Sequence, residues 1–85
     1  MENYSLSIKP SALKELEGFP KKIVQQIVAR IEGLSLNPRP PGSQKLSGEE
    51  KYRLRQGPYR VVYAVDDARK VVDVVKIAHR SEVYR

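Results

Sequence analysis

The stretch at residues 52–63 constrains the fold most, because two runs of alternating residues flank the pair Gly57-Pro58. Alternation with a period of two is the pattern of a half-buried β-strand. A glycine at the first central position of a two-residue turn supplies the positive φ that such a turn needs. The stretch therefore predicts a β-hairpin with strands at residues 51–56 and 59–66.

The length of the turn sets the register of this hairpin. With a two-residue turn, Arg55 pairs with Arg60 and Arg53 pairs with Val62, so the three arginines share one face. Like charges opposite each other destabilise a sheet, whereas the planar guanidinium of arginine suits phosphate. The register therefore favours an anion-binding face. The alternative is a solvated basic surface, or ion pairs of these arginines with Glu49, Glu50 or Asp66.

A helical hairpin is predicted before these strands. Proline suits a first helical turn, so Pro10 begins a short helix that ends at Gly18, and Pro20 begins a longer helix. The longer helix has an apolar stripe at helical spacing, which consists of Ile23, Val24, Ile27, Val28, Ile31 and Leu34. This stripe is expected to pack in the core. The side chains of Leu54, Val61 and Tyr63, on the other face of the β-hairpin, are expected to meet the helices.

Further strands are predicted near both ends of the chain. Residues 3–9 alternate, and residues 70–78 are nearly continuous in apolar side chains, which indicates a central strand. Residues 37–48 hold three of the six prolines and read as a loop. The predicted fold class is α+β, in the order β-α-α-β-β-β. An antiparallel sheet of about four strands has the helices on one face.

Composition limits the possible functions. With 85 residues the chain is expected to form one domain, residues 1–85, and its net charge of +6 favours an anionic partner. The absence of cysteine excludes disulfides and a thiolate nucleophile, and a single histidine excludes a histidine-rich metal site. No cofactor or metal is expected. No apolar run is long enough to span a membrane and no signal pattern begins the chain, so a cytoplasmic protein is expected.

The segment after the last predicted strand adds further candidates. It begins with His79 and Arg80 and includes Tyr84. Histidine is the usual general acid or base near neutral pH. A tyrosine has an ordinary pKa of about 10 and needs nearby cations to act as a base. Such residues are more often surface or packing residues, but beside three arginines on one face they become catalytic candidates.

These residues together resemble a known family. The order of elements, the Tyr-Arg-Leu-Arg-x-Gly-x-Tyr-Arg-Val-Val-Tyr hairpin, Lys45-Leu46-Ser47-Gly48 and the ending at residues 79–85 resemble the RelE/ParE superfamily of bacterial and archaeal toxins. The resemblance covers essentially the whole chain and implies a toxin of a type II toxin–antitoxin pair. RelE-like members inhibit translation as metal-independent endoribonucleases. They cleave mRNA in the ribosomal A site, where the 2′-hydroxyl of the RNA attacks the adjacent phosphorus.

The resemblance also implies roles for single residues. Arg60 matches the arginine that binds the phosphate. Arg80 matches the arginine that stabilises or protonates the leaving group. Tyr84 matches the tyrosine that acts as base or stacks on a substrate base, and His79 is the other candidate for the base.

Basic residues on the strands complete the expected site. Arg53 and Arg55 match basic strand positions of the RelE-like branch, where some members have lysine. Arginine stays charged, so these two residues are expected to hold phosphate and not to accept a proton. Lys45 and Lys51 are expected to contribute to RNA and phosphate binding.

Partners follow from the same resemblance. They are the ribosome and mRNA, and a cognate antitoxin whose contacting helical segment should be acidic because the chain carries a charge of +6. Two alternatives remain open. One is a ParE-like toxin that binds DNA gyrase without catalysis, although that branch usually lacks the full set of four arginines and a tyrosine. The other is an inactive basic RNA-binding domain.

Overall fold

The computed structural model describes residues 3–46 and 50–79. Its elements in chain order are β1 (Ser5–Ile8), α1 (Pro10–Glu17), α2 (Lys21–Gly33), β2 (Ser43–Lys45), β3 (Lys51–Gln56), β4 (Tyr59–Asp66) and β5 (Val71–His79). The predicted helices, hairpin strands and last strand are all present. Neither helix in this part of the chain has the length and apolar character that crossing a lipid bilayer requires.

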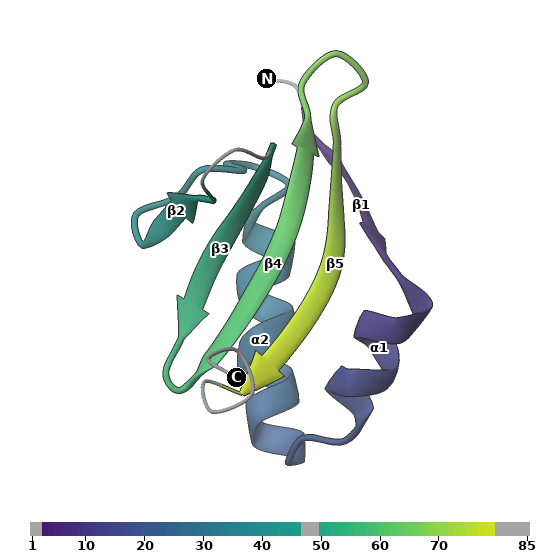
Figure 1. Ribbon diagram of the computed structural model, residues 1–85, viewed down its shortest axis with the longest axis vertical. Helices are drawn as coiled ribbons and strands as arrows, with labels where there is room; N and C mark the ends of the chain where they lie inside the picture. The colour runs from purple at the N-terminus through teal and green to yellow at the C-terminus, as the bar shows by residue number, and fades with distance from the viewer. Residues whose placement is uncertain (1–2, 47–49, 80–85) are drawn as a thin grey trace.

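The strands form one five-stranded sheet in the order β1-β5-β4-β3-β2 (Figure 1). Strand β1 runs parallel to β5, and the other neighbouring pairs are antiparallel. The α+β class is confirmed, but the prediction of an antiparallel sheet of about four strands is wrong in two details. The sheet is mixed because β1 and β5 run in the same direction. The two helices and three other strands separate these neighbours in the sequence, so no tight turn joins them. The sheet has a fifth strand, because β2 forms inside the predicted loop at residues 37–48.

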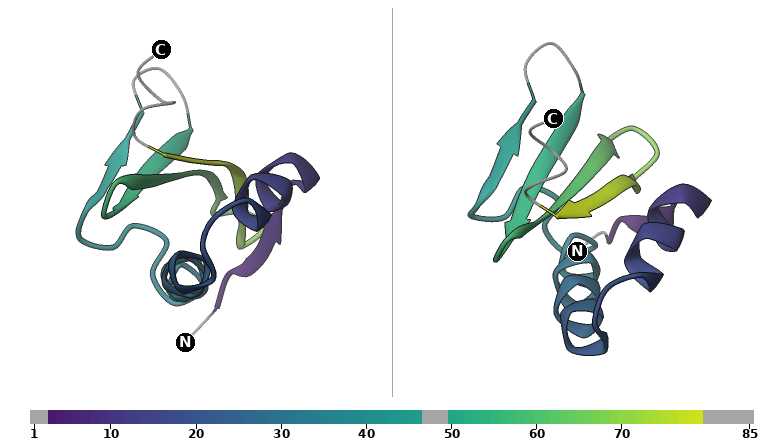
Figure 2. Two further views of the ribbon diagram at one scale, coloured as in Figure 1. Left: turned by 90° about the horizontal axis from the view of Figure 1, so that it is seen from below. Right: turned by 60° about the horizontal axis from the view of Figure 1, so that its bottom comes forward.

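Both helices cover the same side of the sheet, as Figure 2 shows from two directions. Their apolar sides meet the side chains that the strands direct toward them, and the resulting core is the one predicted for the helical stripe and the hairpin. The buried core consists of Ala12, Leu16, Ile27, Ile31, Leu34, Leu54, Val61, Tyr63, Val65, Val72, Val74 and Ile77. No helix among the described residues lies over the opposite side of the sheet, which we call the open face.

The β3–β4 hairpin has the register that its turn predicts. Arg55 pairs with Arg60 and Arg53 pairs with Val62. Gly57 has a φ of +58°, a conformation that glycine adopts without steric cost. The turn chemistry thus places alternate residues of both strands on the open face.

Strand β5 contains a bulge. Val62 of β4 pairs with Lys76, but the next residue, Tyr63, pairs with Val74, so Val75 is an extra residue in β5. An extra residue inverts the alternation of side chains beyond it. As a result Val74 and Ile77, three positions apart, both point into the core.

A carboxylate from α1 stabilises the backbone at this bulge. Glu15 Oε1 accepts a hydrogen bond from the backbone N–H of Ile77 at 3.1 Å, and Oε2 accepts one from Lys76 Nζ at 2.9 Å. The backbone N–H of Ile77, which lies beyond the end of the β1–β5 pairing, thereby has a hydrogen-bond partner. The contact also fixes α1 against β5.

The loop between α2 and β2 is held against β3, β4 and the turn that follows β4. Arg39 donates to both carboxylate oxygens of Asp67, at 2.8 and 3.3 Å, and its Nε donates to the Tyr52 hydroxyl at 2.9 Å. The buried Tyr63 hydroxyl donates to the backbone carbonyl of Pro38 at 2.7 Å. These contacts order the loop, and the order of the loop positions β2 beside β3.

Candidate nucleic-acid interface

Four of the sequence-predicted site residues lie on the open face. Residues paired across a sheet share a face, and the pairing places these residues in successive rows. Lys51 lies in a row with Ala64, Arg53 with Val62, and Arg55 with Arg60. The expected basic surface is therefore formed by Arg53, Arg55 and Arg60, which we call the basic end of the open face, whereas Lys51 lies in the row of Ala64 and Asp73, toward the other end.

The two arginines of the last row differ in exposure. Arg55 is exposed, whereas Arg60 is only 3% exposed although neither of the described helices covers this face. A buried guanidinium interacts strongly with an anion because the local dielectric constant is low. Direct contact between Arg60 and a phosphate, however, requires its guanidinium to become more accessible than it is in this structure.

Arg53 is held by a residue that the sequence did not single out. Its Nη2 donates to Gln44 Oε1 at 2.6 Å, and Gln44 is its direct partner in the β2–β3 register. Together with Gly42 and Arg55, these two residues line a pocket of about 250 Å³. No sequence pattern indicates Gln44, because residues 37–48 read as a loop and Ser43, Gln44 and Lys45 are all polar.

His79 lies on the other side of the sheet. It pairs with Tyr59, and the two rings meet edge to face with centroids 5.2 Å apart. Tyr59 in turn packs against Phe19, which precedes α2, at 4.6 Å. The bulge at Val75 turns His79 toward the helix side, away from the arginines, and its catalytic role stays a prediction.

Lys45 is also directed away from the basic end. It pairs with Tyr52 and so falls on the alternate positions to Gln44, and its Nζ lies 3.9 Å from Glu50 Oε1. The one-residue step from Gln44 places it on the face opposite to the arginines, and its expected contribution to RNA and phosphate binding stays a prediction. Arg80 and Tyr84 lie outside the described residues.

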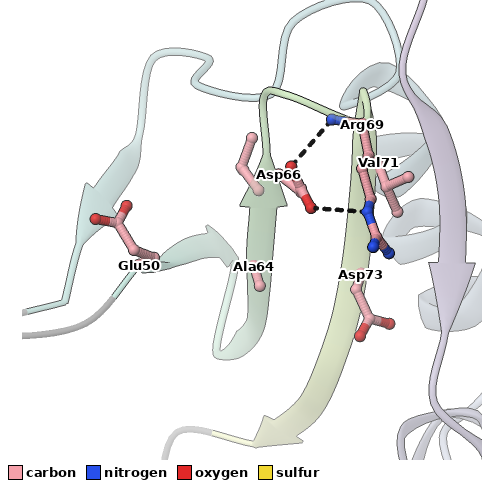
Figure 3. Close-up of a pocket in the computed structure, with 7 residues that line it drawn as sticks. Glu50, Ala64, Asp66, Arg69, Val71 and Asp73 are labelled. Carbon is pink, nitrogen blue, oxygen red and sulfur yellow. Dashed lines mark hydrogen bonds and ion pairs between the residues drawn. The ribbon is translucent and has the colours of Figure 1, made fainter.

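The other end of the open face is acidic. A pocket of about 310 Å³ there is lined by Glu50, Ala64, Val65, Asp66, Arg69, Val71 and Asp73, and Figure 3 shows the carboxylates around it. Asp66 accepts a hydrogen bond from the backbone N–H of Arg69 at 3.0 Å. Within the described part of the chain no three such side chains are grouped to hold a metal ion. An acidic rim repels phosphate, so an RNA site on this face belongs at the basic end.

The loop contacts shift two pKa values. The hydrogen bond from Arg39 to Asp67, with a further one from Tyr4, lowers the pKa of that carboxyl to about 2. Burial raises the pKa of the Tyr63 hydroxyl above its ordinary value. At neutral pH, Asp67 is therefore ionised and accepts its hydrogen bonds, and the Tyr63 hydroxyl is protonated and donates its own.

Comparison with known proteins places the chain in a family. A family model described as the ParE toxin of the type II toxin–antitoxin system parDE matches residues 6–84. Toxin RelE from Mycobacterium tuberculosis is 37% identical over 84 residues, which cover 96% of this chain and 87% of that protein. The relatives named by these comparisons are toxins.

Solved structures agree with this class. The toxin–antitoxin complex RelBE2 from Mycobacterium tuberculosis contains a chain that matches with a TM-score of 0.81 and 26% identity, over 92% of this chain and 99% of that one. The intact RelBE complex of Escherichia coli matches with a TM-score of 0.76 and 30% identity, over 89% of this chain and 95% of that one. The chain belongs to the RelE/ParE superfamily of type II toxin–antitoxin toxins, as its motifs indicate.

Proposed function

We propose that this toxin is a ribosome-dependent endoribonuclease that cleaves mRNA and so inhibits translation in the cytoplasm. The observation that supports this most is the basic end of the open face, where the register aligns Arg53, Arg55 and Arg60. The 37% identity with a protein named toxin RelE supports the same branch of the superfamily.

The proposed reaction needs no metal. The 2′-hydroxyl of a ribose attacks the adjacent phosphorus, its proton passes to a base, and the 5′-oxygen of the next nucleotide leaves with a proton. The products are a 2′,3′-cyclic phosphate and a free 5′-hydroxyl. The phosphorane formed on the way carries extra negative charge, which preorganised guanidinium groups stabilise.

Each residue has a role in this proposal. Arg53 and Arg55 hold the substrate phosphates from the open face, and Lys51 extends the RNA path. Arg60 stabilises the charge on phosphorus, and Arg80 assists the leaving oxygen. Because His79 packs against Tyr59, Tyr84 is the candidate for the base, and cations near it would favour the phenolate.

A cognate antitoxin is the proposed partner that controls this activity. The RelBE2 and RelBE structures are complexes of a toxin with its antitoxin. The chain carries a net charge of +6, so an acidic helical segment of the antitoxin would complement the basic end and exclude RNA from it. A neutral or basic antitoxin segment at this surface would contradict this part of the proposal.

The test is a translating cell-free extract with purified toxin free of antitoxin. We expect new mRNA 5′ ends within ribosome-bound codons, mapped by primer extension, and none on the same RNA without ribosomes. A parallel assay of DNA gyrase supercoiling examines the ParE-like alternative. Intact mRNA together with inhibited supercoiling would reject the endoribonuclease, and intact mRNA with unaffected gyrase would favour an inactive RNA-binding domain.

A further inference from the structure

Gln44 is the residue of the open face whose role the proposed function leaves unexplained. It is exposed, it lies on the edge strand β2, and it makes one hydrogen bond to the guanidinium of Arg53. We infer that Gln44 positions Arg53 for phosphate and holds it without neutralising its charge. This inference rests on the proposed function and adds a positioning residue to it.

The register of the sheet brings Gln44 and Arg53 into contact. Gln44 and Arg53 are direct partners across the antiparallel β2–β3 pair, so their side chains leave the backbone side by side on one face. The hydrogen bond of 2.6 Å restrains an otherwise flexible side chain at the edge of the pocket that both residues line. A guanidinium restrained in advance loses less conformational freedom when it binds phosphate.

The orientation of the Gln44 amide follows from the chemistry of its partner. A guanidinium has only donors, so the amide oxygen of Gln44 must face Arg53. The two N–H groups of the amide therefore point away from Arg53. Because Arg55 lines the same pocket, Gln44 offers these donors beside it to an RNA oxygen or base nitrogen that enters there.

The neutrality of Gln44 is the decisive property. A carboxylate at this position would make a cross-strand ion pair with Arg53, which favours the folded sheet. The same ion pair would compete with phosphate for the guanidinium and repel the RNA backbone. Stability of the sheet therefore favours a carboxylate at residue 44, whereas RNA binding favours a neutral acceptor, and glutamine is a neutral acceptor.

The experiment compares Gln44→Glu and Gln44→Ala with the control Gln26→Glu. The control makes the same charge change at an exposed position of α2, in the layer on the other side of the sheet. Three quantities are measured for each variant. These are the melting temperature, the affinity for a short single-stranded RNA by fluorescence anisotropy, and the rate of cleavage of ribosome-bound mRNA.

We expect Gln44→Glu to melt at or above the wild-type temperature and to lose about tenfold in RNA affinity and cleavage, the size of one charge-assisted contact. Gln44→Ala should lose about threefold, and Gln26→Glu should stay close to wild type. A purely structural role for Gln44 would instead make affinity follow the melting temperature. Wild-type affinity and cleavage in Gln44→Glu would overturn the inference.

A double variant tests whether Gln44 acts through Arg53. In the Arg53→Ala background, Gln44→Ala should change RNA affinity by less than about twofold, because the contact is already lost. Additive losses would show that Gln44 acts independently of Arg53 and would overturn the positioning role. Absence of mRNA cleavage by the wild type would reject the proposed function, while the affinity measurements would still test the Gln44–Arg53 coupling.

Discussion

Arg55 and Arg60 face each other directly across the β3–β4 hairpin on the open face of the sheet. Two like charges in this position destabilise a sheet by a few tenths of a kcal/mol, up to about 1 kcal/mol. A like-charged pair that weakens the fold points to an anionic ligand, and the pair therefore gives a test that separates stability from function.

Replacing Arg55 by glutamine should stabilise the protein and impair its activity. Loss of the repulsion should raise the free energy of unfolding by about 0.5 kcal/mol and the melting temperature by about 2–4 °C. RNA affinity should fall by about tenfold, because a phosphate contact is removed. Calorimetry and anisotropy measure the two effects. A variant that is both less stable and fully able to bind RNA would contradict the assignment of Arg55.

Asp67 should contribute to stability in a defined acidic window. Its pKa falls from 3.8 to about 2, chiefly through the hydrogen bond from Arg39. A lowered carboxyl pKa means that the contribution is present above pH 3.8 and is lost as the pH falls through about 2.

We therefore expect Asp67→Asn to melt below wild type at pH 5, with a difference that narrows between pH 4 and pH 2. Thermal unfolding at several pH values checks this. A difference independent of pH over that range would show that the charge of Asp67 is not the cause.

The hydroxyl of Tyr63 should contribute about 1 kcal/mol to the free energy of unfolding. Tyr63→Phe keeps the buried ring but removes the hydrogen bond to the Pro38 carbonyl, at 2.7 Å in the structure, and a typical net value for such a bond is about 1 kcal/mol. Urea unfolding measures the loss. Tyr59→Phe is the control, and it should cost less than about 0.5 kcal/mol.

Tyr63 should also make the fold sensitive to alkali. Burial raises the pKa of its hydroxyl above the ordinary value of 10.0, so the folded state disfavours the phenolate. The stabilisation is complete below pH 10.0 and is lost as the pH rises through the pKa of the folded protein. Tyr63→Phe should show a smaller loss of stability than wild type over that range, and equal losses would contradict the assignment.

Glu15 should stabilise β5 at its bulge. Glu15→Ala removes the acceptor of the Ile77 N–H and the partner of Lys76, and we expect a loss of about 1–2 kcal/mol. Glu15→Gln keeps an oxygen for the N–H and should lose less than half as much. Amide hydrogen exchange at Ile77 reports the contact directly. Unchanged protection in Glu15→Ala would mean that the contact does not stabilise this strand.

Local patterns predicted the hairpin and helices because the determinants lie within a few residues. The turn at Gly57 fixes the pairing of Arg55 with Arg60, and the stripe that includes Ile27 and Ile31 fixes the buried side of α2. The same reasoning correctly placed three arginines on one face. These features need no knowledge of the rest of the chain.

Features that depend on distant pairing were not predicted. Strand β2 has three residues and forms only because β3 lies beside it and the Arg39–Asp67 contact holds the loop. The parallel pairing of β1 with β5 joins the two ends of the described chain. Val75, the extra residue of the bulge, turns His79 to the helix side. In the sequence, only the spacing of the apolar residues Val72, Val74 and Ile77 indicates this bulge.

One comparison of charge-matched variants tests the function of the basic end of the open face most directly. The double variant Arg53→Gln, Arg55→Gln removes two charges from the open face, and the double variant Lys21→Gln, Lys22→Gln removes two from exposed positions of α2. Both have the same net charge, and both are assayed for cleavage of ribosome-bound mRNA.

We expect the arginine variant to lose at least about a hundredfold in cleavage rate, since two charge-assisted contacts to phosphate are lost. The lysine variant should stay within about threefold of wild type, because it changes only the long-range field. Equal losses in the two variants would show that net charge, and not the arginine-bearing face of the sheet, governs the activity, and would contradict the account.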